Sequence, residues 1–304
     1  MNKLISSLTE GAGGQILYGL TPPKLDNPEE KNRRISERRI DRIASVPVDG
    51  LVVYDIQDED TRTNEERPFP FLETIPSYTY AADYLQPLPV PKIVYLSVGK
   101  YHPQEIDAIL DGLHGGAVVF VGSPSPEFPA KTSLREAYEI YQRHSSQVLL
   151  GGVTIAERHQ KHGNEHEKLL RKSNSGCSFF VSQCIFNAEL FKDLLSDYHH
   201  CCQDSGQPMK PVFMTLTPCG SLKTLEFIKW LGIQVPRWME NDLLRNTDTL
   251  DYSLRMCREI FLNIQDFCRS KRIPLGCNIE SVAVQRDEVL ASFELVKEIR
   301  SLQQ

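Results

Sequence analysis

The segment Ala-Val-Val-Phe-Val-Gly at residues 117–122 decides the fold. Its first five side chains are all apolar, which is typical of a strand in a parallel sheet that is buried on both faces. Seven other short runs of similar character lie before and after it, and a longer segment of helical period follows each run. This alternation is the pattern of successive strand, helix and strand units in a parallel sheet.

Eight strands, each followed by a helix, predict an α/β fold of the (β/α)8 barrel type. The predicted strands span 15–21, 50–56, 92–98, 117–122, 147–154, 178–183, 211–217 and 274–280. The predicted helices span 28–44, 76–85, 103–113, 134–144, 165–173, 188–203, 222–231 and 287–302. The segment 235–271 is surplus to a minimal barrel, and 250–268 within it is strongly amphipathic. We therefore expect one domain over 1–304 with an extra helical piece before the last strand.

Length, composition and charge narrow the classes of function. The chain has 304 residues, of which 40% are hydrophobic, so it can bury a sizeable core. A formal net charge of −6 without a dense basic run argues against nucleic acid and anionic membranes as partners. No apolar stretch approaches the length of a membrane span, and residues 1–14 do not have the pattern of a signal peptide. The expected location is the cytoplasm, and a homo-oligomer remains open.

Cysteines and histidines offer no recognisable metal-binding spacing. All eight cysteines lie between Cys177 and Cys277 without a Cys-x-x-Cys pair, so we expect reduced thiols. The set His159, His162 and His166 has helical spacing, but Gly163 interrupts it and no cysteine or clear carboxylate partner completes a known metal-binding spacing. The run 199–202, His-His-Cys-Cys, consists of neighbours that point about 100° apart on a helix. The sequence thus predicts no metal site.

Six segments carry a resemblance to a known family. In chain order they are Leu-Tyr-Gly-Leu-Thr-Pro-Pro at 17–23, Gly-Ser-Pro-Ser-Pro at 122–126, Ala-Glu-Arg-His at 156–159, Leu-Leu-Arg-Lys-Ser-Asn-Ser-Gly at 169–176, Phe-Val-Ser-Gln-Cys-Ile-Phe-Asn at 180–187 and Ile-Gln-Val-Pro-Arg-Trp-Met at 233–239. In the same order they resemble segments of the methylenetetrahydrofolate reductases. The resemblance implies the barrel fold and an NAD(P)H-dependent FAD enzyme of one-carbon metabolism and methionine biosynthesis that reduces a folate.

The resemblance also implies which residues bind FAD. Tyr95, Gly122, Ser123, Thr154, His159, Glu165, Lys168, Arg171 and Lys172 form the implied FAD-binding set. Glu165 would hold the ribose, and Arg171 with Lys172 would meet the diphosphate, for which arginine offers two parallel hydrogen bonds. Another interpretation of Arg171 and Lys172 is that they complement the negative end of a helix.

Gln183 is the predicted residue for both substrate binding and catalysis. In the family resembled, this glutamine hydrogen-bonds the pterin and then the nicotinamide. Because an unpaired buried amide costs about 1–3 kcal/mol, a glutamine that closes an apolar strand needs a partner. A neighbouring backbone group is the alternative partner to a ligand.

Two positions depart from the family pattern. Gly19 stands at the substrate where the family has its general-acid glutamate, and such an acid contributes about 10²- to 10⁴-fold to a rate. Asp55 is the predicted substitute acid, with Asp58 and Glu157 behind it, although Asp55 could also be a loop acid or a helix cap. A glutamate restored at Gly19 is expected to raise folate reduction.

Ser123 is the second departure, since the family has an aspartate there and an arginine at the position of Val121. An anionic neighbour disfavours an anionic reduced flavin, so serine should make a bound flavin easier to reduce. Two alternatives stay open beside the flavoenzyme. One is a non-catalytic or non-redox member that binds a pterin or nucleotide, and the other is a folate-linked methyl-transfer protein.

Overall fold

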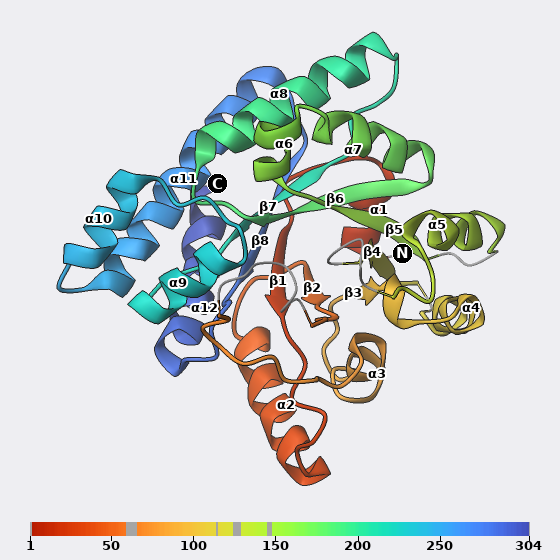
Figure 1. Cartoon of the computed structure of the whole chain (residues 1–304), viewed down its shortest axis with the longest axis horizontal. Coiled ribbons are helices and arrows are strands. Elements are labelled where there is room, and N and C mark those ends of the chain that lie inside the picture. Colours follow the sequence, from red (N-terminus) through yellow and green to blue (C-terminus); the bar gives the residue numbers. More distant parts are fainter. Residues whose placement is uncertain (1, 59–65, 114, 124–128, 145–147, 304) are drawn as a thin grey trace.

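Eight parallel strands form a closed barrel in chain order (Figure 1). The computed structural model describes residues 2–58, 66–113, 115–123, 129–144 and 148–303. Its strands are β1 (Ile16–Leu20), β2 (Gly50–Val53), β3 (Lys92–Ser97), β4 (Ala117–Val121), β5 (Leu149–Thr154), β6 (Cys177–Cys184), β7 (Val212–Leu216) and β8 (Leu275–Glu280). The predicted (β/α)8 barrel is confirmed. Residues 59–65 of the long acidic loop, 124–126 of the second motif and the predicted first residue of the fifth strand, 147, lie outside the described ranges.

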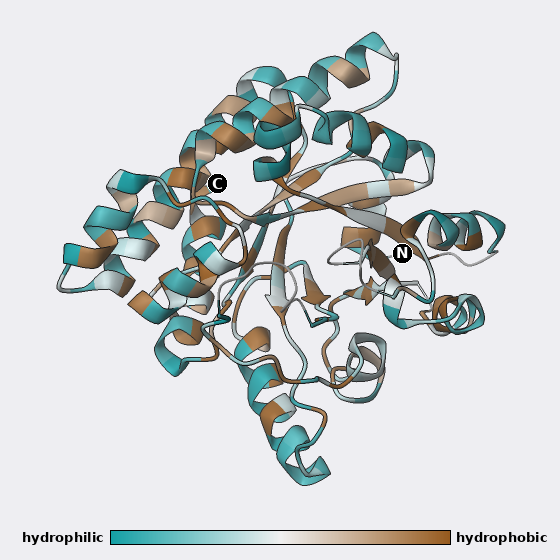
Figure 2. Cartoon of the chain, viewed as in Figure 1, coloured by the Kyte–Doolittle hydropathy of each residue, from teal (hydrophilic) through white to brown (hydrophobic). Residues whose placement is uncertain are grey.

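Helices surround the strands. They are α1 (Lys3–Thr9), α2 (Glu29–Ala44), α3 (Ser77–Asp83), α4 (Pro103–Gly112), α5 (Leu134–Arg143), α6 (Ala156–His162), α7 (Glu165–Asn174), α8 (Ala188–Asp204), α9 (Leu222–Trp230), α10 (Arg237–Arg245), α11 (Thr249–Lys271) and α12 (Arg286–Leu302). Figure 2 shows mostly hydrophobic residues along the strands and mostly hydrophilic residues on the helices, as burial of the sheet requires. No helix within the described ranges is long and apolar enough to span a membrane.

The extra piece before the last strand consists of two helices, α10 and α11. The sequence predicted a helical piece here, and this prediction is confirmed. It missed α1 and α6, which have seven residues each. Gly163 adopts φ 67° and ends α6 in the left-handed conformation, so the histidine-rich segment forms two helices, α6 and α7.

The interior of the barrel is a packed core that α1 closes at the amino-terminal ends of the strands. Leu4 and Leu8 of this helix belong to the same buried cluster as the inward side chains of the strands. Gly276 leaves room for the Phe213 ring, because a Cβ on Gly276 would lie 2.4 Å from two ring carbons. Large side chains therefore interlock with glycines across neighbouring strands, as dense packing requires.

The opposite end of the barrel is its mouth, where the carboxyl ends of the strands meet. Closure of the sheet pairs β1 with β8 and places Gly19 in register with Glu280. Gln183 lies near the end of β6, and Ser123 follows β4. The residues expected at strand ends thus lie at this end of the barrel, where sites on this fold are built.

Candidate functional site

A carboxyl group contributed by β8 lies at the mouth of the barrel. Glu280 ends this strand and is half-buried. Its Oε1 accepts a hydrogen bond from the Cys184 thiol at 3.0 Å. Burial raises the pKa of Glu280, although hydrogen bonds from Cys184, Tyr54 and Asn278 oppose the rise. A carboxyl group with a raised pKa keeps its proton to higher pH and can act as an acid.

Gly19 has no room for a side chain, because Tyr54 and Glu280 fill the space beside it. A Cβ built on Gly19 would lie 2.7 Å from Tyr54 Oη and 3.1 Å from Glu280 Oε2. The position of the missing family glutamate is therefore next to the carboxyl group of another strand. The mouth keeps an acid at this place, and β8 supplies it instead of β1.

A chain of hydrogen bonds runs inward from this acid. Asn278 Nδ2 donates to Tyr54 Oη at 2.9 Å and to Thr215 Oγ1 at 3.2 Å. Thr215 Oγ1 donates to the carbonyl of Ser182 at 2.6 Å. Burial raises the pKa of Tyr54 well above its usual value, so its hydroxyl stays protonated. Asn278 Oδ1 is buried without a hydrogen-bond partner in the described ranges, which leaves one acceptor for a ligand.

Gln183 has one satisfied and one unsatisfied end. Its Nε2 donates to the carbonyl of Leu231 at 2.9 Å, so the backbone partner considered as an alternative does exist. Its Oε1 is buried, and no described residue pairs with it. The predicted roles of Gln183 in substrate binding and catalysis stay predictions, and the unpaired oxygen is the atom that would serve them.

Asp55 is held by a cation and several donors. Lys100 Nζ lies 2.5 Å from Asp55 Oδ1, and the side chain of Asp55 is 1% exposed. The backbone N–H of Ser97 and the hydroxyl of Tyr101 donate to Oδ2 at 2.8 and 3.2 Å. This arrangement fixes the segment after β2 to the segment after β3. Its predicted role as the substitute acid stays a prediction, while Glu280 offers an acid without an ion pair among the described residues.

The two acids ranked behind Asp55 lie at the edge of the site. Glu157 lies in the first turn of α6. Its Oε1 accepts a hydrogen bond from the backbone N–H of Gln234 at 3.0 Å. Asp58 is exposed at the start of the loop after β2. Neither lies on a barrel strand, whereas Glu280 ends β8 in register with Gly19.

Arg171 and Lys172, the implied diphosphate pair, point to different places. Arg171 is exposed and lies 3.6 Å from Glu167 one helical turn earlier. Lys172 Nζ donates to the carbonyl of Val153 at 2.5 Å, and burial lowers its pKa. The two side chains therefore do not form a single clamp for a diphosphate.

The other implied FAD residues on this side lie around the end of β5. Glu165 is almost fully buried, and its Oε2 accepts a hydrogen bond from Lys168 Nζ at 3.0 Å. His159 is buried on α6 with its Nε2 3.0 Å from Asp197 Oδ2. Thr154 Oγ1 and His159 Nδ1 are buried without a partner in the part of the chain that the structure describes.

The implied residues near β3 and β4 complete the mouth. Tyr95 meets Tyr54 edge to face, with ring centroids 4.9 Å apart. The carbonyl of Gly122 accepts a hydrogen bond from Gln57 Nε2 at 3.1 Å. Ser123 lies against Gly99, whose Cβ position would be 3.0 Å from Ser123 Oγ.

Sequence reasoning missed four residues at the centre of the site: Glu280, Asn278, Tyr54 and Cys184. The position of Glu280 in the sequence could have pointed to it. It is the last residue of a predicted barrel strand, and polar residues at the carboxyl ends of such strands are often functional. Asn278 lies two residues earlier and therefore on the same face of the strand. Glu280 and Gly19 become neighbours only when β1 pairs with β8 to close the barrel, and the order of residues in the sequence does not show this pairing.

Arg67, in the segment between β2 and α3, packs against side chains of α9 beside this region. Arg67 lies over the rings of Phe71, Phe227 and Trp230, at 5.1 to 5.5 Å from their centroids. Its Nε and Nη1 are buried and have no hydrogen-bond partner within the described ranges. Trp230 precedes Leu231, whose carbonyl binds Gln183. An unpaired guanidinium suits an incoming carboxylate.

Fold and site together define a (β/α)8 barrel whose mouth carries an acid with a raised pKa and two buried amide oxygens that have no partner among the described residues. A solved structure from Clostridium thermocellum, described as an uncharacterized protein that binds two copies of 5-methyl-5,6,7,8-tetrahydrofolic acid, is 43% identical to this chain. The match covers 98% of this chain and 99% of that one with a TM-score of 0.86. The chain belongs to the same family as this protein.

A more distant structure shares the fold alone. It is the oxygenating constituent of 3,6-diketocamphane monooxygenase from Pseudomonas putida in complex with FMN, at 11% identity and a TM-score of 0.54. The match covers 95% of this chain and 99% of that one. No protein-family model and no curated protein sequence matches this chain.

Proposed function

We propose that this protein binds a reduced folate at the mouth of the barrel, with Glu280 as the acid that faces the pterin. The observation that carries the proposal is the raised pKa of Glu280 at the same mouth as Asn278 Oδ1 and Gln183 Oε1, two buried oxygens without a partner among the described residues. The 43% identity to a protein described as binding a methylated tetrahydrofolate supports it.

The chemistry of the mouth fits a reduced pterin. Such a ring presents N–H groups along its edge, and Asn278 Oδ1 and Gln183 Oε1 are acceptors that have no partner in the described ranges. Satisfying a buried acceptor is worth about 1–3 kcal/mol. A protonated Glu280 can donate to a ring nitrogen, and proton transfer of this kind contributes about 10²- to 10⁴-fold to a rate. The acid would thus activate the bound folate for transfer of its one-carbon unit.

Arg67 is the proposed partner of the acidic tail of the folate. Its guanidinium is stacked on three aromatic rings and keeps two buried N–H groups unpaired within the described ranges. The glutamate tail of a folate carries carboxylates, which arginine binds through paired hydrogen bonds. The pterin at Gln183 and the tail at Arg67 would then lie on either side of the carboxyl end of α9.

Calorimetric titration with 5-methyltetrahydrofolate and tetrahydrofolate tests the proposal. Wild-type protein is expected to bind, and Gln183→Met should weaken binding by about tenfold, because an unsatisfied pterin donor costs roughly 1.4 kcal/mol. The matched control is Gln160→Met, since Gln160 is an exposed glutamine of α6. Wild-type protein that binds neither folate overturns the proposal, as does equal weakening by both substitutions.

Flavin-dependent reduction of the folate by NAD(P)H is the second candidate function. The unpaired buried atoms Thr154 Oγ1 and His159 Nδ1 favour a further ligand on the implied FAD segment. The diphosphate pair does not fit the cofactor as it stands, because Arg171 is exposed and Lys172 is bound to the carbonyl of Val153. No step of the folate proposal therefore depends on flavin.

An absorbance spectrum separates the two candidates. A flavoenzyme should be yellow as purified or after soaking with FAD, should bleach with NADH or NADPH, and should lose flavin when Arg171 and Lys172 are both changed to alanine. Folate binding without any flavin uptake removes the second candidate and favours a folate carrier or methyl-transfer protein.

A further inference from the structure

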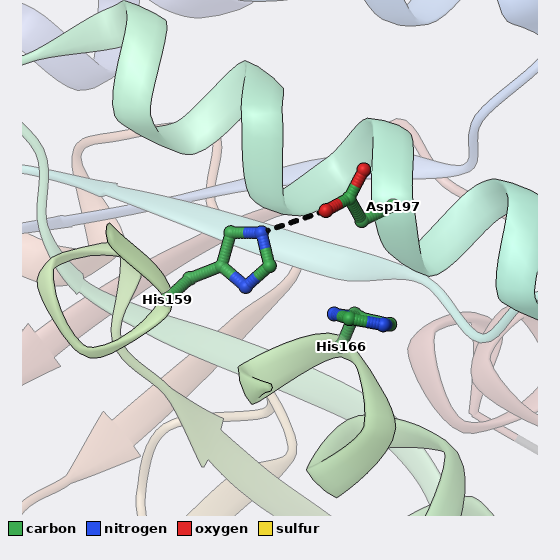
Figure 3. A group of neighbouring side chains, drawn as sticks. All are labelled: His159, His166 and Asp197. Atoms are coloured by element: carbon green, nitrogen blue, oxygen red, sulfur yellow. Dashed lines mark hydrogen bonds and ion pairs between the residues drawn. The ribbon is translucent and has the colours of Figure 1, made fainter. Parts of the chain in front are cut away.

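We propose that His159, His166 and Asp197 form a binding site for a divalent transition-metal ion. The three residues come from α6, α7 and α8, and Figure 3 shows them turned toward one another between these helices. The site is separate from the acid and amides of the mouth, so the proposal stands independently of folate binding.

The geometry brings three ligand atoms into one small volume. One nitrogen of each histidine and one oxygen of Asp197 all lie within 4.8 Å of one another. His159 Nε2 is 3.0 Å from Asp197 Oδ2, and the two imidazole rings are nearly perpendicular with centroids 5.3 Å apart. Metal–ligand bonds of about 2.0–2.2 Å in a tetrahedral arrangement need ligand atoms about 3.3 Å apart. Rotation of the Asp197 and His166 side chains can bring the ligand atoms closer to this spacing, because Asp197 is exposed and His166 is half-buried.

Unpaired nitrogens give an independent indication of a ligand. His159 is 7% exposed, and its Nδ1 is buried without a hydrogen-bond partner among the described residues. His166 Nδ1 is likewise buried and has no hydrogen-bond partner among the described residues. Buried polar atoms in proteins are usually paired, and a group left unpaired points to an absent water, ion or ligand. An imidazole ring presents only one of its nitrogens to a given ion, so an ion between these helices would take one nitrogen from each ring together with an oxygen of Asp197. The Nδ1 atoms are the nitrogens that have no other partner among the described residues.

A surface hollow gives an ion access to the site. His166 and Asp197 line it together with His200, Cys201 and Asp204. The residues of α8 in this group recur every three or four positions, which places them on one face of the helix. Asp204 adds negative charge at the hollow, which attracts a cation.

The donor set selects the class of ion. Imidazole nitrogen with one carboxylate suits zinc and its neighbours, whereas magnesium and calcium prefer oxygen ligands. The ion would cross-link α6 and α7, which Gly163 separates, to the long helix α8. Search along the sequence found no carboxylate for the histidines because Asp197 follows His159 by 38 residues.

Titration of untagged, chelator-treated protein with Zn²⁺, followed by calorimetry and by the melting temperature, tests the site. We expect one Zn²⁺ per chain and a higher melting temperature with the ion. His166→Ala and Asp197→Asn should each weaken binding by more than about tenfold, since even partners behind metal ligands contribute tenfold or more. His162→Ala is the matched control, because this exposed histidine of α6 lies outside the cluster.

The outcomes separate cleanly. Loss of binding in both variants with retention in the control supports the site. Should His166→Ala fail to fold, Asp197→Asn alone decides, because it changes an exposed side chain of nearly the same shape. Wild-type protein without Zn²⁺ binding, or loss that is equal in the His162→Ala control, overturns the proposal.

Discussion

Asp55 and Glu280 are two carboxyl groups at the same mouth that the fold treats in opposite ways. Asp55 has Lys100 at 2.5 Å and receives further hydrogen bonds from Ser97 and Tyr101. Glu280 has a thiol, a phenol and an amide around it, and no ion pair to it exists among the described residues. Burial disfavours the charged form of an acid, and it raises the pKa of Glu280, beside which no cation lies among the described residues.

This difference suits Asp55 to a structural contact and Glu280 to the proposed role as a general acid. The Asp55 carboxylate joins two loops, and its two oxygens accept hydrogen bonds from the Ser97 N–H, Lys100 Nζ and the Tyr101 hydroxyl. The Glu280 carboxyl has a raised pKa and lies beside Gly19 at the mouth of the barrel. Perturbed acids at a barrel mouth are typical of functional sites, and compensated ion pairs are typical of structural ones.

The largest expected effect is on stability at Asp55. Asp55→Ala leaves Lys100, the Ser97 N–H and the Tyr101 hydroxyl without their acceptor, and breaking a buried pair in this way costs about 3–5 kcal/mol. Because Lys100 is 29% exposed and keeps some hydration, we expect the lower end of this range. Urea unfolding measures the change. A loss below about 1 kcal/mol would contradict the structural role.

A smaller effect is expected at Gly19, with the opposite sign to the one that the family resemblance predicts. Gly19→Glu places a side chain within 2.7 Å of Tyr54 Oη and a second carboxyl beside Glu280. Overpacking typically costs about 1–3 kcal/mol. We expect a lower melting temperature and no gain in any folate reaction. A stable variant with a higher rate would restore the sequence-based expectation.

The smallest expected effect is a pH dependence at Glu280. A carboxyl whose pKa is raised in the folded state stabilises the fold fully below its unfolded pKa, near 4.5, and this contribution is lost as pH rises through the raised pKa. Glu280→Gln removes this pH-dependent contribution to stability. The melting temperature of the variant minus that of wild type should therefore increase, on the order of a few degrees, between pH 5 and pH 8.

The control for this measurement is Glu294→Gln, because Glu294 is an exposed acid of α12. Its melting temperature relative to wild type should stay flat over the same pH range. A flat difference for Glu280→Gln as well would show that this carboxyl is ionised throughout, which contradicts its role as an acid.

The barrel could be predicted because each strand carries its own signal. Segments such as Ala117–Val121 are buried on both faces and are therefore continuous apolar runs. Helix α6 could not be found in this way, since it is short and polar and ends at Gly163. A helix of seven residues has little periodicity to detect.

The site was predictable only where it follows strand ends. Gln183 and Thr154 were placed correctly by this rule, although it says nothing of their partners. The sequence offers Asp55 as the substitute acid, which stays a prediction, and it shows neither the cation at Lys100 nor the contact between Gly19 and Glu280. Both depend on which strands become neighbours when the sheet closes.

Helix α1, which closes the floor of the barrel, gives the interior one entrance. Leu4 and Leu8 are each 1% exposed and pack with the inward side chains of the strands. In the proposed folate complex, a ligand seated at the mouth would cover the open end of the barrel. Glu280 would then have one proton to deliver for each binding event, and departure of the ligand would be the step that lets solvent reload it.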